Sequence, residues 1–224
     1  MKKNKKSKSF CVIGLGKFGI ALATRLAEEG NQVMIIDTDA EKVNSLADIV
    51  TNAVIGDPTN ETVLKSAGIG DYDCAIVCFT GNINDNVLMT IMLKEAGVKK
   101  VVARAANEGH RKVLSHIGAD VIVYPEQDMG EKVAFMLTRE KVTEFIEFSG
   151  YMLIEIPVPD KWCGQSLIDL DLRRKYGINV IAVTRSDDNV ADVSPAPTRQ
   201  FSKGEKASVI GSEKDIERLI KQFG

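Results

Sequence analysis

Three glycines near the start of the chain have the spacing of a phosphate-binding turn. Gly14, Gly16 and Gly19 form a G-x-G-x-x-G pattern directly after one apolar run, and Asp37 ends the next apolar run. In this pattern the glycines permit a tight turn, close approach of a phosphate, and close packing of helix on strand. An acid such as Asp37 suits a free ribose 2′-hydroxyl, while the N-cap of the following helix is its ordinary alternative role. The pattern predicts nucleotide binding at the start of a helix.

Residue types that could carry catalysis do not assemble around this turn. His110 and His116 fall on one expected helix at a spacing that does not place them on one face, and we interpret both as helix-surface residues. Asp169 and Asp171 diverge on a helix, which argues against paired-carboxylate chemistry. The sequence contains no G-x-S-x-G, H-E-x-x-H or P-loop motif. These features favour a binding protein over an enzyme.

The cysteines do not form a metal or redox motif. No two of Cys11, Cys74, Cys78 and Cys163 are spaced as C-x-x-C, and the first three lie inside apolar runs. Cysteine in such a run behaves as a small hydrophobic residue. We therefore expect reduced, buried thiols, as is typical of a cytosolic protein.

The composition is that of an ordinary globular protein. The chain has 224 residues, 44% of them hydrophobic and 27% charged, with a formal net charge of −2. This balance gives no general case for nucleic-acid binding, and the apolar runs are too short to span a bilayer. Lysines cluster in the first eight residues without the apolar region of a signal peptide. We interpret Lys2, Lys3, Lys5, Lys6 and Lys8 as a solvated, disordered tail, with weak attraction to acidic lipid as the alternative.

Short apolar runs alternate with helical patterns over most of the chain, which predicts an α/β fold with a Rossmann-like, doubly wound parallel sheet. The expected strands are 9–13, 32–36, 51–55, 73–79, 100–104 and 120–123. The expected helices are 17–29, 40–48, 60–68, 83–96 and 108–117. A linking helix at 126–139 completes a first domain spanning 9–140, and its apolar stripe could pack on its own sheet or on a partner chain. That stripe consists of Met129, Val133, Met136 and Leu137.

The remaining residues, 141–224, have the pattern of a small α+β domain. Strands are expected at 151–156, 180–183, 190–193 and 207–211, with helices near 165–175 and 213–222. The absence of a low-complexity linker indicates that the helix at 126–139 itself joins the two domains.

The order of motifs along residues 9–222 resembles the KtrA/TrkA type of RCK subunit, which regulates potassium transport. The resemblance rests on Val12–Gly19, Val33–Asp37, Gly56–Thr59, Ile117–Asp120, Tyr124–Gly130, Ser166–Arg173, Tyr176–Ile181 and Ser194–Pro197. It implies a regulator without enzymatic activity, in which nucleotide exchange changes the shape of an octameric ring of dimers. It also implies a cytoplasmic location, at the inner face of the membrane, under a potassium translocation subunit of the KtrB or TrkH type.

The resemblance implies that ATP or ADP occupies the first domain, with NAD(H) less favoured. Lys17 stands where the KtrA branch often has an arginine facing the terminal phosphate, and a solvated surface lysine is the alternative. Arg104 would lie near the phosphates, or else form a surface ion pair. Asp57 and the residues after the fourth strand would border the adenosine, or else serve ordinary turns. The implied nucleotide contacts are Gly14, Leu15, Gly16, Lys17, Phe18, Asp37, Thr38, Asp57, Phe79, Thr80, Gly81, Asn82, Arg104 and Ala105.

Two further ligands are implied by the same resemblance. Glu126 would help to bind Mg²⁺ or Ca²⁺ beside the phosphates, or would act only as a favourable acid at the start of a helix. Cyclic di-AMP would bind the C-terminal domain, where Arg173 suits a phosphate, although a solvated basic turn at this position is the alternative. The implied cyclic di-AMP contacts are Leu167, Ile168, Asp171, Arg173, Ile178, Asn179, Ile181 and Pro195.

Two other functions remain open from the sequence. The dinucleotide pattern alone is compatible with a small NAD(H)-dependent oxidoreductase. A nucleotide sensor that acts on a transporter of another ion would share every feature of the first domain.

Overall fold

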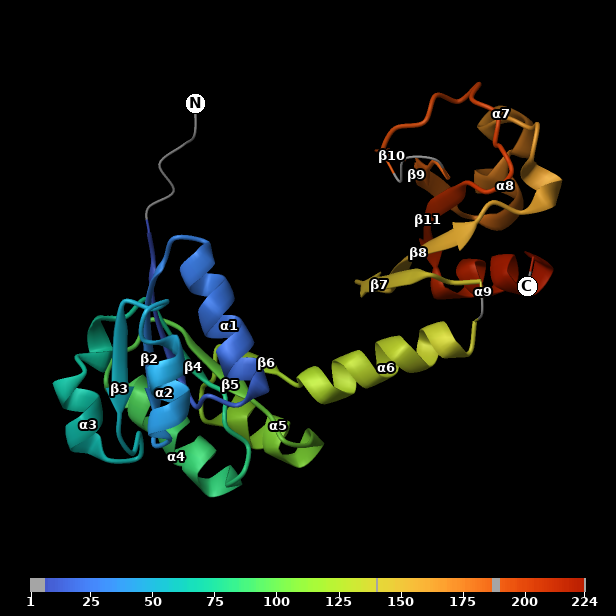
Figure 1. Ribbon diagram of the computed structural model, residues 1–224. Helices are drawn as coiled ribbons and strands as arrows, with labels where there is room; N and C mark the ends of the chain where they lie inside the picture. Colours follow the sequence, from blue (N-terminus) through green and yellow to red (C-terminus); the bar gives the residue numbers. More distant parts are fainter. Residues whose placement is uncertain (1–6, 140, 187–189, 224) are drawn as a thin grey trace. The chain divides into compact units, whose positions relative to one another are not determined.

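The computed structural model describes residues 7–139, 141–186 and 190–223. Four of the lysines in the predicted tail, Lys2, Lys3, Lys5 and Lys6, lie outside these residues, whereas Lys8 is described and exposed. The chain divides into two compact units, unit 1 up to Glu126 and unit 2 from Gln127 onward. Figure 1 shows both, and each is described by itself.

Unit 1 alternates strands with helices. Its strands are β1 Ser9–Ile13, β2 Gln32–Asp37, β3 Asn52–Ile55, β4 Cys74–Val77, β5 Val101–Arg104 and β6 Val121–Val123. Its helices are α1 Lys17–Glu28, α2 Ala40–Leu46, α3 Glu61–Ser66, η1 Ile69–Asp71, α4 Ile83–Glu95 and α5 Glu108–His116. All of these except η1 lie where the sequence predicts them, with ends that differ by a few residues.

The sheet of unit 1 is parallel, with strand order β3-β2-β1-β4-β5-β6. The chain leaves β1 toward β2 on one side, and β4 flanks β1 on the other, so the strand order reverses at β1. This arrangement confirms the predicted Rossmann-like sheet, in which ligands bind outside the carboxyl ends of the strands at the reversal point.

Both faces of this sheet are covered by helices, as Figure 1 shows. Alternate residues of β1 explain this: Val12 packs with side chains of α1 and α2, while Cys11 and Ile13 pack with those of α3 and α4. A strand buried on both faces reads as a continuous apolar run, which is why the sequence identified these strands.

Unit 2 contains an antiparallel sheet of order β10-β9-β11-β8-β7. Its strands are β7 Glu144–Phe148, β8 Tyr151–Pro157, β9 Asn179–Thr184, β10 Ala191–Asp192 and β11 Lys206–Ser212. Its helices are α6 Pro125–Leu137, η2 Asp160–Trp162, α7 Leu167–Leu170, α8 Leu172–Tyr176 and α9 Glu213–Phe223. The α6 helix begins at the last residues of unit 1 and lies mainly in unit 2. The core of unit 2 gathers around Trp162, Ile154 and Ile216.

Three sequence predictions differ from the structure. The helix expected at 165–175 is divided into α7 and α8 at Asp171, whose backbone is left-handed with φ of 45°. Strand β7 was not predicted, because an edge strand with mostly exposed side chains lacks an apolar run. His110 is buried rather than on the surface, because it shares the inner face of α5 with Leu114.

Helix α6 carries an exposed apolar stripe. Met129 is 58% exposed and Leu137 is 76% exposed, and no residue of this helix is buried. Its inner side is joined to β7, because the rings of Phe135 and Phe145 stack with their centres 4.1 Å apart. Among the described residues, no helix is long and apolar enough to cross a membrane.

Candidate functional site

The three glycines of the loop Gly14–Gly19, here called the glycine loop, differ in how much space surrounds them. Gly14 has φ of +94°, and a Cβ there would lie 3.0 Å from the Cβ and backbone nitrogen of Phe79. A Cβ on Gly19 would lie only 2.1 Å from the carbonyl oxygen of Gly14. A Cβ on Gly16, by contrast, would meet no described atom within 4 Å. Two glycines are therefore required by packing, and the middle one faces open space where a ligand fits.

The amino end of α1 is available to an anion. Gly16 is its N-cap, has no side chain to cap the helix, and the first turn contains no acidic residue. Unpaired N–H groups and the helix dipole favour negative charge at such an end. Lys17 begins the helix and is exposed, and it has no ion-pair partner within the described part of the chain. This arrangement suits a phosphate.

Asp37 is tied to the glycine loop by its carboxylate. Its Oδ2 accepts a hydrogen bond from the Leu15 N–H at 2.5 Å, and its Oδ1 accepts one from the Asp39 N–H at 2.9 Å. The N-cap of α2 is Asp39, so the helix-capping role that the sequence left open for Asp37 belongs to its neighbour. Each carboxylate oxygen can accept a further bond, so Asp37 can hold the loop and a ribose hydroxyl together.

On the other side of β1, the ends of β4 and β5 are joined by a buried amide. The Nδ2 of Asn86 donates to the carbonyl oxygens of Phe79 at 2.7 Å and Arg104 at 3.2 Å. Its Oδ1 is buried and has no partner among the described residues. The sequence analysis missed Asn86, although one signal was present. It stands in line with the buried Met89 and Leu93 on α4, where a polar residue is unusual.

Arg104 connects the glycine loop with the start of α6. Its guanidinium lies 5.8 Å from the centre of the Phe18 ring, and its Nη1 donates to the Cys78 carbonyl oxygen at 3.2 Å. Its Nη2 forms an ion pair with Glu126. The Arg104 side chain is 16% exposed, whereas that of Glu126 is 61% exposed. A covered cation next to the glycine loop pairs here with a carboxylate, and a phosphate could take that place.

The other predicted nucleotide contacts lie in loops at the same edge of the sheet. Thr38 and Gly81 are exposed, Thr80 is half-buried and Ala105 is buried. Two of the predicted residues have local roles: the Asp57 carboxylate accepts from the Thr59 hydroxyl at 2.7 Å, and Asn82 caps α4. These roles correspond to the turn chemistry that the sequence kept as an alternative.

Unit 2 contains a hollow of about 350 Å³ beside its two short helices. The lining residues are Leu167, Ile168, Asp171, Leu172, Arg173, Ile178, Asn179 and Val180. Six of the eight residues predicted to contact cyclic di-AMP are among them. Ile181 and Pro195 are not in the lining; Ile181 lies on β9 with 39% exposure, and Pro195 lies on the segment before β11.

The chemistry of the hollow combines apolar surface with one cation. Ile168 is 61% exposed, and Arg173 is exposed on α8. The left-handed backbone at Asp171 turns the chain between α7 and α8, and the Asp171 carboxylate pairs with Arg174 at 3.0 Å. Asp169 closes a capping box with Ser166. The hollow thus offers an exposed apolar side chain and a cation, which could take a ligand with an apolar part and a negative charge.

Three buried cysteines and the buried His110 have pKa values that are shifted by burial. Burial raises the pKa of Cys78 to about 12, and it raises the pKa of Cys11 and Cys74 as well. Burial lowers the pKa of His110, whose Nδ1 accepts from the Ala106 N–H at 3.2 Å. Across the ranges that the structure describes, no three His, Cys, Asp or Glu residues gather as metal ligands. Glu126 alone is therefore not a complete cation site.

Comparison with known proteins identifies both units. The TrkA-N domain family matches residues 10–125, and the TrkA-C domain family matches residues 151–224. The chain is 44% identical to Ktr system potassium uptake protein C of Bacillus subtilis (strain 168), covering 96% of this chain and 97% of the relative. It is 39% identical to Ktr system potassium uptake protein A of the same organism, covering 96% of both chains.

A solved structure shares the fold. The crystal structure of the GsuK RCK domain has a TM-score of 0.56 and 22% identity, covering 99% of this chain and 48% of that one. The domain matches, the two full-length relatives and the observed sheet agree with one another. The chain belongs to the KtrA/TrkA family of RCK regulatory subunits of potassium uptake systems.

Proposed function

We propose that this chain is the nucleotide-gated regulatory subunit of a Ktr/Trk-type potassium transporter, with ATP or ADP bound in unit 1 and cyclic di-AMP in unit 2. The observation that carries the proposal is the glycine loop. Gly14 and Gly19 are fixed by packing while Gly16 is open to a ligand, at the point where the strand order reverses.

The cations around the loop favour ATP or ADP over NAD(H). Solved GsuK structures of this fold include one bound to NAD and one bound to ADP, so the fold does not choose between them. Lys17 at the start of α1 and the covered Arg104 would supply two positive charges to the phosphate end of a nucleotide in the glycine loop. A terminal phosphate carries more charge than a bridging pyrophosphate, and it gains more from these cations. Lysine at position 17, where the resemblance implies that arginine is often found, would offer a point charge without two-pronged contact.

Glu126 is proposed to supply one carboxylate to Mg²⁺ or Ca²⁺. The remaining oxygen ligands would come from nucleotide phosphates and from a second subunit, because the described residues form no group of three or more His, Cys, Asp or Glu side chains that could hold a metal ion. The Arg104–Glu126 ion pair would link nucleotide binding to cation binding. Nucleotide phosphates would compete for Arg104, and the carboxylate released would then be free to face a cation.

The hollow of unit 2 is the proposed cyclic di-AMP site. Ile168, which is exposed, would contact adenine, Arg173 would pair with a phosphate, and Asn179 would meet a base edge, while Ile178 is fully buried and would form only the floor of the hollow. The hollow is open on one side, and a second copy of unit 2 facing it would enclose the ligand. Ile181 and Pro195, which lie outside the hollow of one chain, could then contribute at the interface between copies.

Assembly into dimers and an octameric ring is part of the proposal. The exposed stripe of Met129, Val133 and Leu137 on α6 is the apolar surface that a second chain could cover. The ring would bind a membrane translocation subunit from the cytoplasmic side. Gating then requires the nucleotide to contact two ring shapes differently, because a ligand with equal affinity for both shapes shifts no equilibrium. No catalytic role is assigned to any residue.

A ligand screen of the full chain, combined with native mass spectrometry, tests the proposal. Calorimetric titration should show tighter binding of ATP and ADP than of NADH, and separate binding of cyclic di-AMP. The native mass should correspond to a ring of dimers. Steady oxidation of NADH with a small carbonyl substrate would instead support the oxidoreductase alternative and contradict the regulatory assignment.

A further inference from the structure

A long connection in unit 2, residues 193–205, runs from β10 to β11 and is here called the connecting segment. Its strand-like pairing is limited to two isolated bridges, Ser166 with Gln200 and Cys163 with Phe201. Its first half is largely exposed, with Val193 at 73% exposure. A segment of this length without regular structure needs side-chain anchors to hold one conformation.

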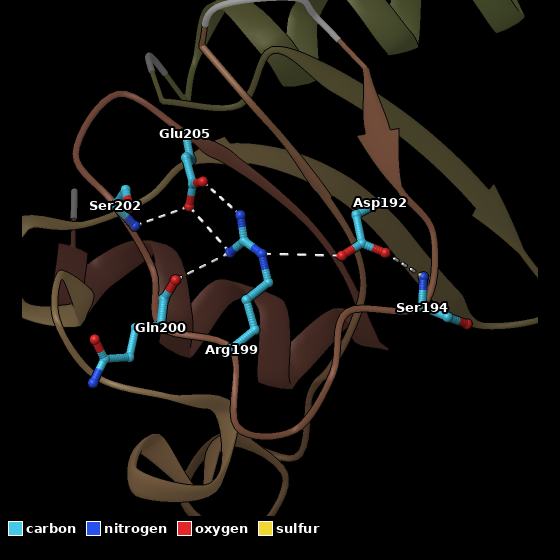
Figure 2. Close-up of polar contacts among 6 residues, drawn as sticks. All are labelled: Asp192, Ser194, Arg199, Gln200, Ser202 and Glu205. Carbon is cyan, nitrogen blue, oxygen red and sulfur yellow. Dashed lines mark hydrogen bonds and ion pairs between the residues drawn. The ribbon is translucent and has the colours of Figure 1, made fainter.

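Arg199 is the central anchor of the connecting segment, as Figure 2 shows. Its Nη2 lies 2.5 Å from Oε1 of Glu205, and its Nη1 lies 3.2 Å from Oε2 of the same carboxylate. Its Nε lies 4.0 Å from the Asp192 carboxylate, and Nη1 also donates to the Gln200 carbonyl oxygen at 3.3 Å. The Arg199 guanidinium therefore joins Asp192, at the end of β10, to Glu205, the last residue of the connecting segment.

The Glu205 end of this link is fixed to the core. The Glu205 side chain is 8% exposed, and its Oε2 accepts from the Ser202 N–H at 2.9 Å. The Glu205 carbonyl oxygen accepts from the Val158 N–H at 2.8 Å, directly after β8. Burial alone would raise the pKa of Glu205, but hydrogen bonds from Arg199 and Ser202 outweigh it and hold the pKa below its ordinary value. The carboxylate therefore stays charged for Arg199.

The same segment touches the wall of the hollow. The Pro197 carbonyl oxygen accepts a hydrogen bond from the Ile168 N–H at 3.2 Å, and Ile168 lines the hollow. The Arg199 N–H donates to the Ala196 carbonyl oxygen at 2.8 Å, which ties Arg199 to the turn that presents Pro197. The position of Ile168 thus depends on the turn at Ala196–Arg199, which the ion pairs of Arg199 hold in place.

We propose that Arg199 is a positioning residue for the ligand site of unit 2. Paired with Glu205 and Asp192, it fixes the connecting segment against Ile168 and sets the shape of the hollow. Its part in cyclic di-AMP affinity rests on the proposed function, whereas its hold on the segment does not. A two-pronged pair of this kind needs the planar fork of arginine, so lysine should replace it only in part.

Hydrogen exchange and calorimetry on the full chain test this inference. In Arg199→Ala, amide exchange should accelerate at Ile168 and across 196–201, while β8 and β11 stay protected. Affinity for cyclic di-AMP should fall by about tenfold, because ligand binding would then have to order the segment beside Ile168. Affinity for ATP should not change. Arg199→Lys should retain the fold. Its amide exchange rates and its affinity for cyclic di-AMP should lie between those of the wild type and those of Arg199→Ala.

Lys203→Ala is the matched control, since Lys203 lies on the same segment with a side chain that is 86% exposed. It should behave as the wild type. Unchanged exchange at Ile168 in both Arg199 variants would overturn the inference, and so would equal acceleration throughout unit 2, which would indicate a general stabilising role. If wild-type protein binds no cyclic di-AMP, the ligand assignment fails, while exchange at Ile168 still decides whether Arg199 positions the segment.

Discussion

The two candidate sites are built from different parts of the polypeptide. The glycine loop of unit 1 presents backbone N–H groups, and its geometry is enforced by contacts such as Gly19 against the Gly14 carbonyl oxygen. The hollow of unit 2 presents side chains, with Ile168 and Arg173 on two short helices that meet at a left-handed residue. A site made of backbone N–H groups takes its shape from the sheet that carries it. A site made of side chains depends on the residues that hold those side chains in position.

This difference suggests a division of labour. In the proposed function, unit 1 would distinguish its occupant by the phosphate end, through Lys17 and Arg104. Unit 2 offers an open site with exposed apolar surface that a ligand or a second copy can complete. Substitutions in the glycine loop should therefore abolish nucleotide binding, whereas substitutions in the hollow should weaken ligand binding by a limited factor.

The largest expected effect comes from Gly19→Ala. The new Cβ would collide with the Gly14 carbonyl oxygen, so the loop must move, which should abolish nucleotide binding and lower the stability of unit 1 by several kcal/mol. Calorimetry with ATP and thermal unfolding would measure the two effects.

Gly16→Ala is its matched control, because that Cβ meets no described atom in the ligand-free protein. It should lose ATP binding but cost only about 1 kcal/mol of stability, as expected for alanine at an N-cap. Normal ATP affinity in Gly16→Ala would show that the open space at this position is not the phosphate site.

Next in size is Arg173→Ala in the hollow. Removing the cation should weaken cyclic di-AMP binding by about 10- to 100-fold, the range expected when a charged partner is lost, and leave ATP affinity unchanged. Lys175→Ala, on the same helix but outside the hollow, should have little effect. Equal losses in the two variants would mean that general positive charge, rather than a defined contact, attracts the ligand.

A smaller effect is expected from Glu126→Gln, measured as ATP affinity with and without Mg²⁺. Without the cation, affinity should rise by about threefold, because Arg104 no longer has a competing carboxylate. The increase in affinity caused by Mg²⁺ should disappear. Asp128→Asn, also exposed on α6, serves as the control, and an unchanged response to Mg²⁺ in Glu126→Gln would remove Glu126 from the cation site.

A further expected effect, on stability rather than on binding, concerns the response of unit 2 to acid. The pKa of Glu205 lies below its ordinary value of 4.5, so its contribution is present above pH 4.5 and is lost as pH falls through the lowered pKa. Glu205→Gln should cost about 1 to 3 kcal/mol at pH 7 and progressively less below pH 4.5. Denaturant unfolding across this pH range measures it, with Asp160→Asn as an exposed control. A constant difference at all pH values would contradict the charged pairing.

The sequence allowed most of unit 1 to be predicted because its constraints are local. Buried parallel strands read as apolar runs, and the glycine loop needs glycine at fixed positions whatever the rest of the chain does. The residues of the hollow were named from a family resemblance, and six of those eight residues line one hollow in the structure. The break at Asp171 could not be predicted, because a left-handed backbone at an aspartate is chosen by its surroundings.

Other features depend on partners far away in the sequence. Asn86 joins the ends of β4 and β5, and its role is visible only when those strands lie side by side. His110 was predicted to lie on the helix surface because its spacing from His116 does not place the two on one face. In the structure it is buried on the same face as Leu114. Pairing of Arg199 with Glu205 likewise requires the folded connecting segment.

A crossed titration tests the central claim most directly. Gly16→Ala and Arg173→Ala, each in the full chain, are titrated with ATP and with cyclic di-AMP. Two independent sites predict that Gly16→Ala loses ATP and keeps cyclic di-AMP, while Arg173→Ala does the reverse. Loss of both ligands in either variant, or of neither in both, would contradict the assignment of one ligand to each unit.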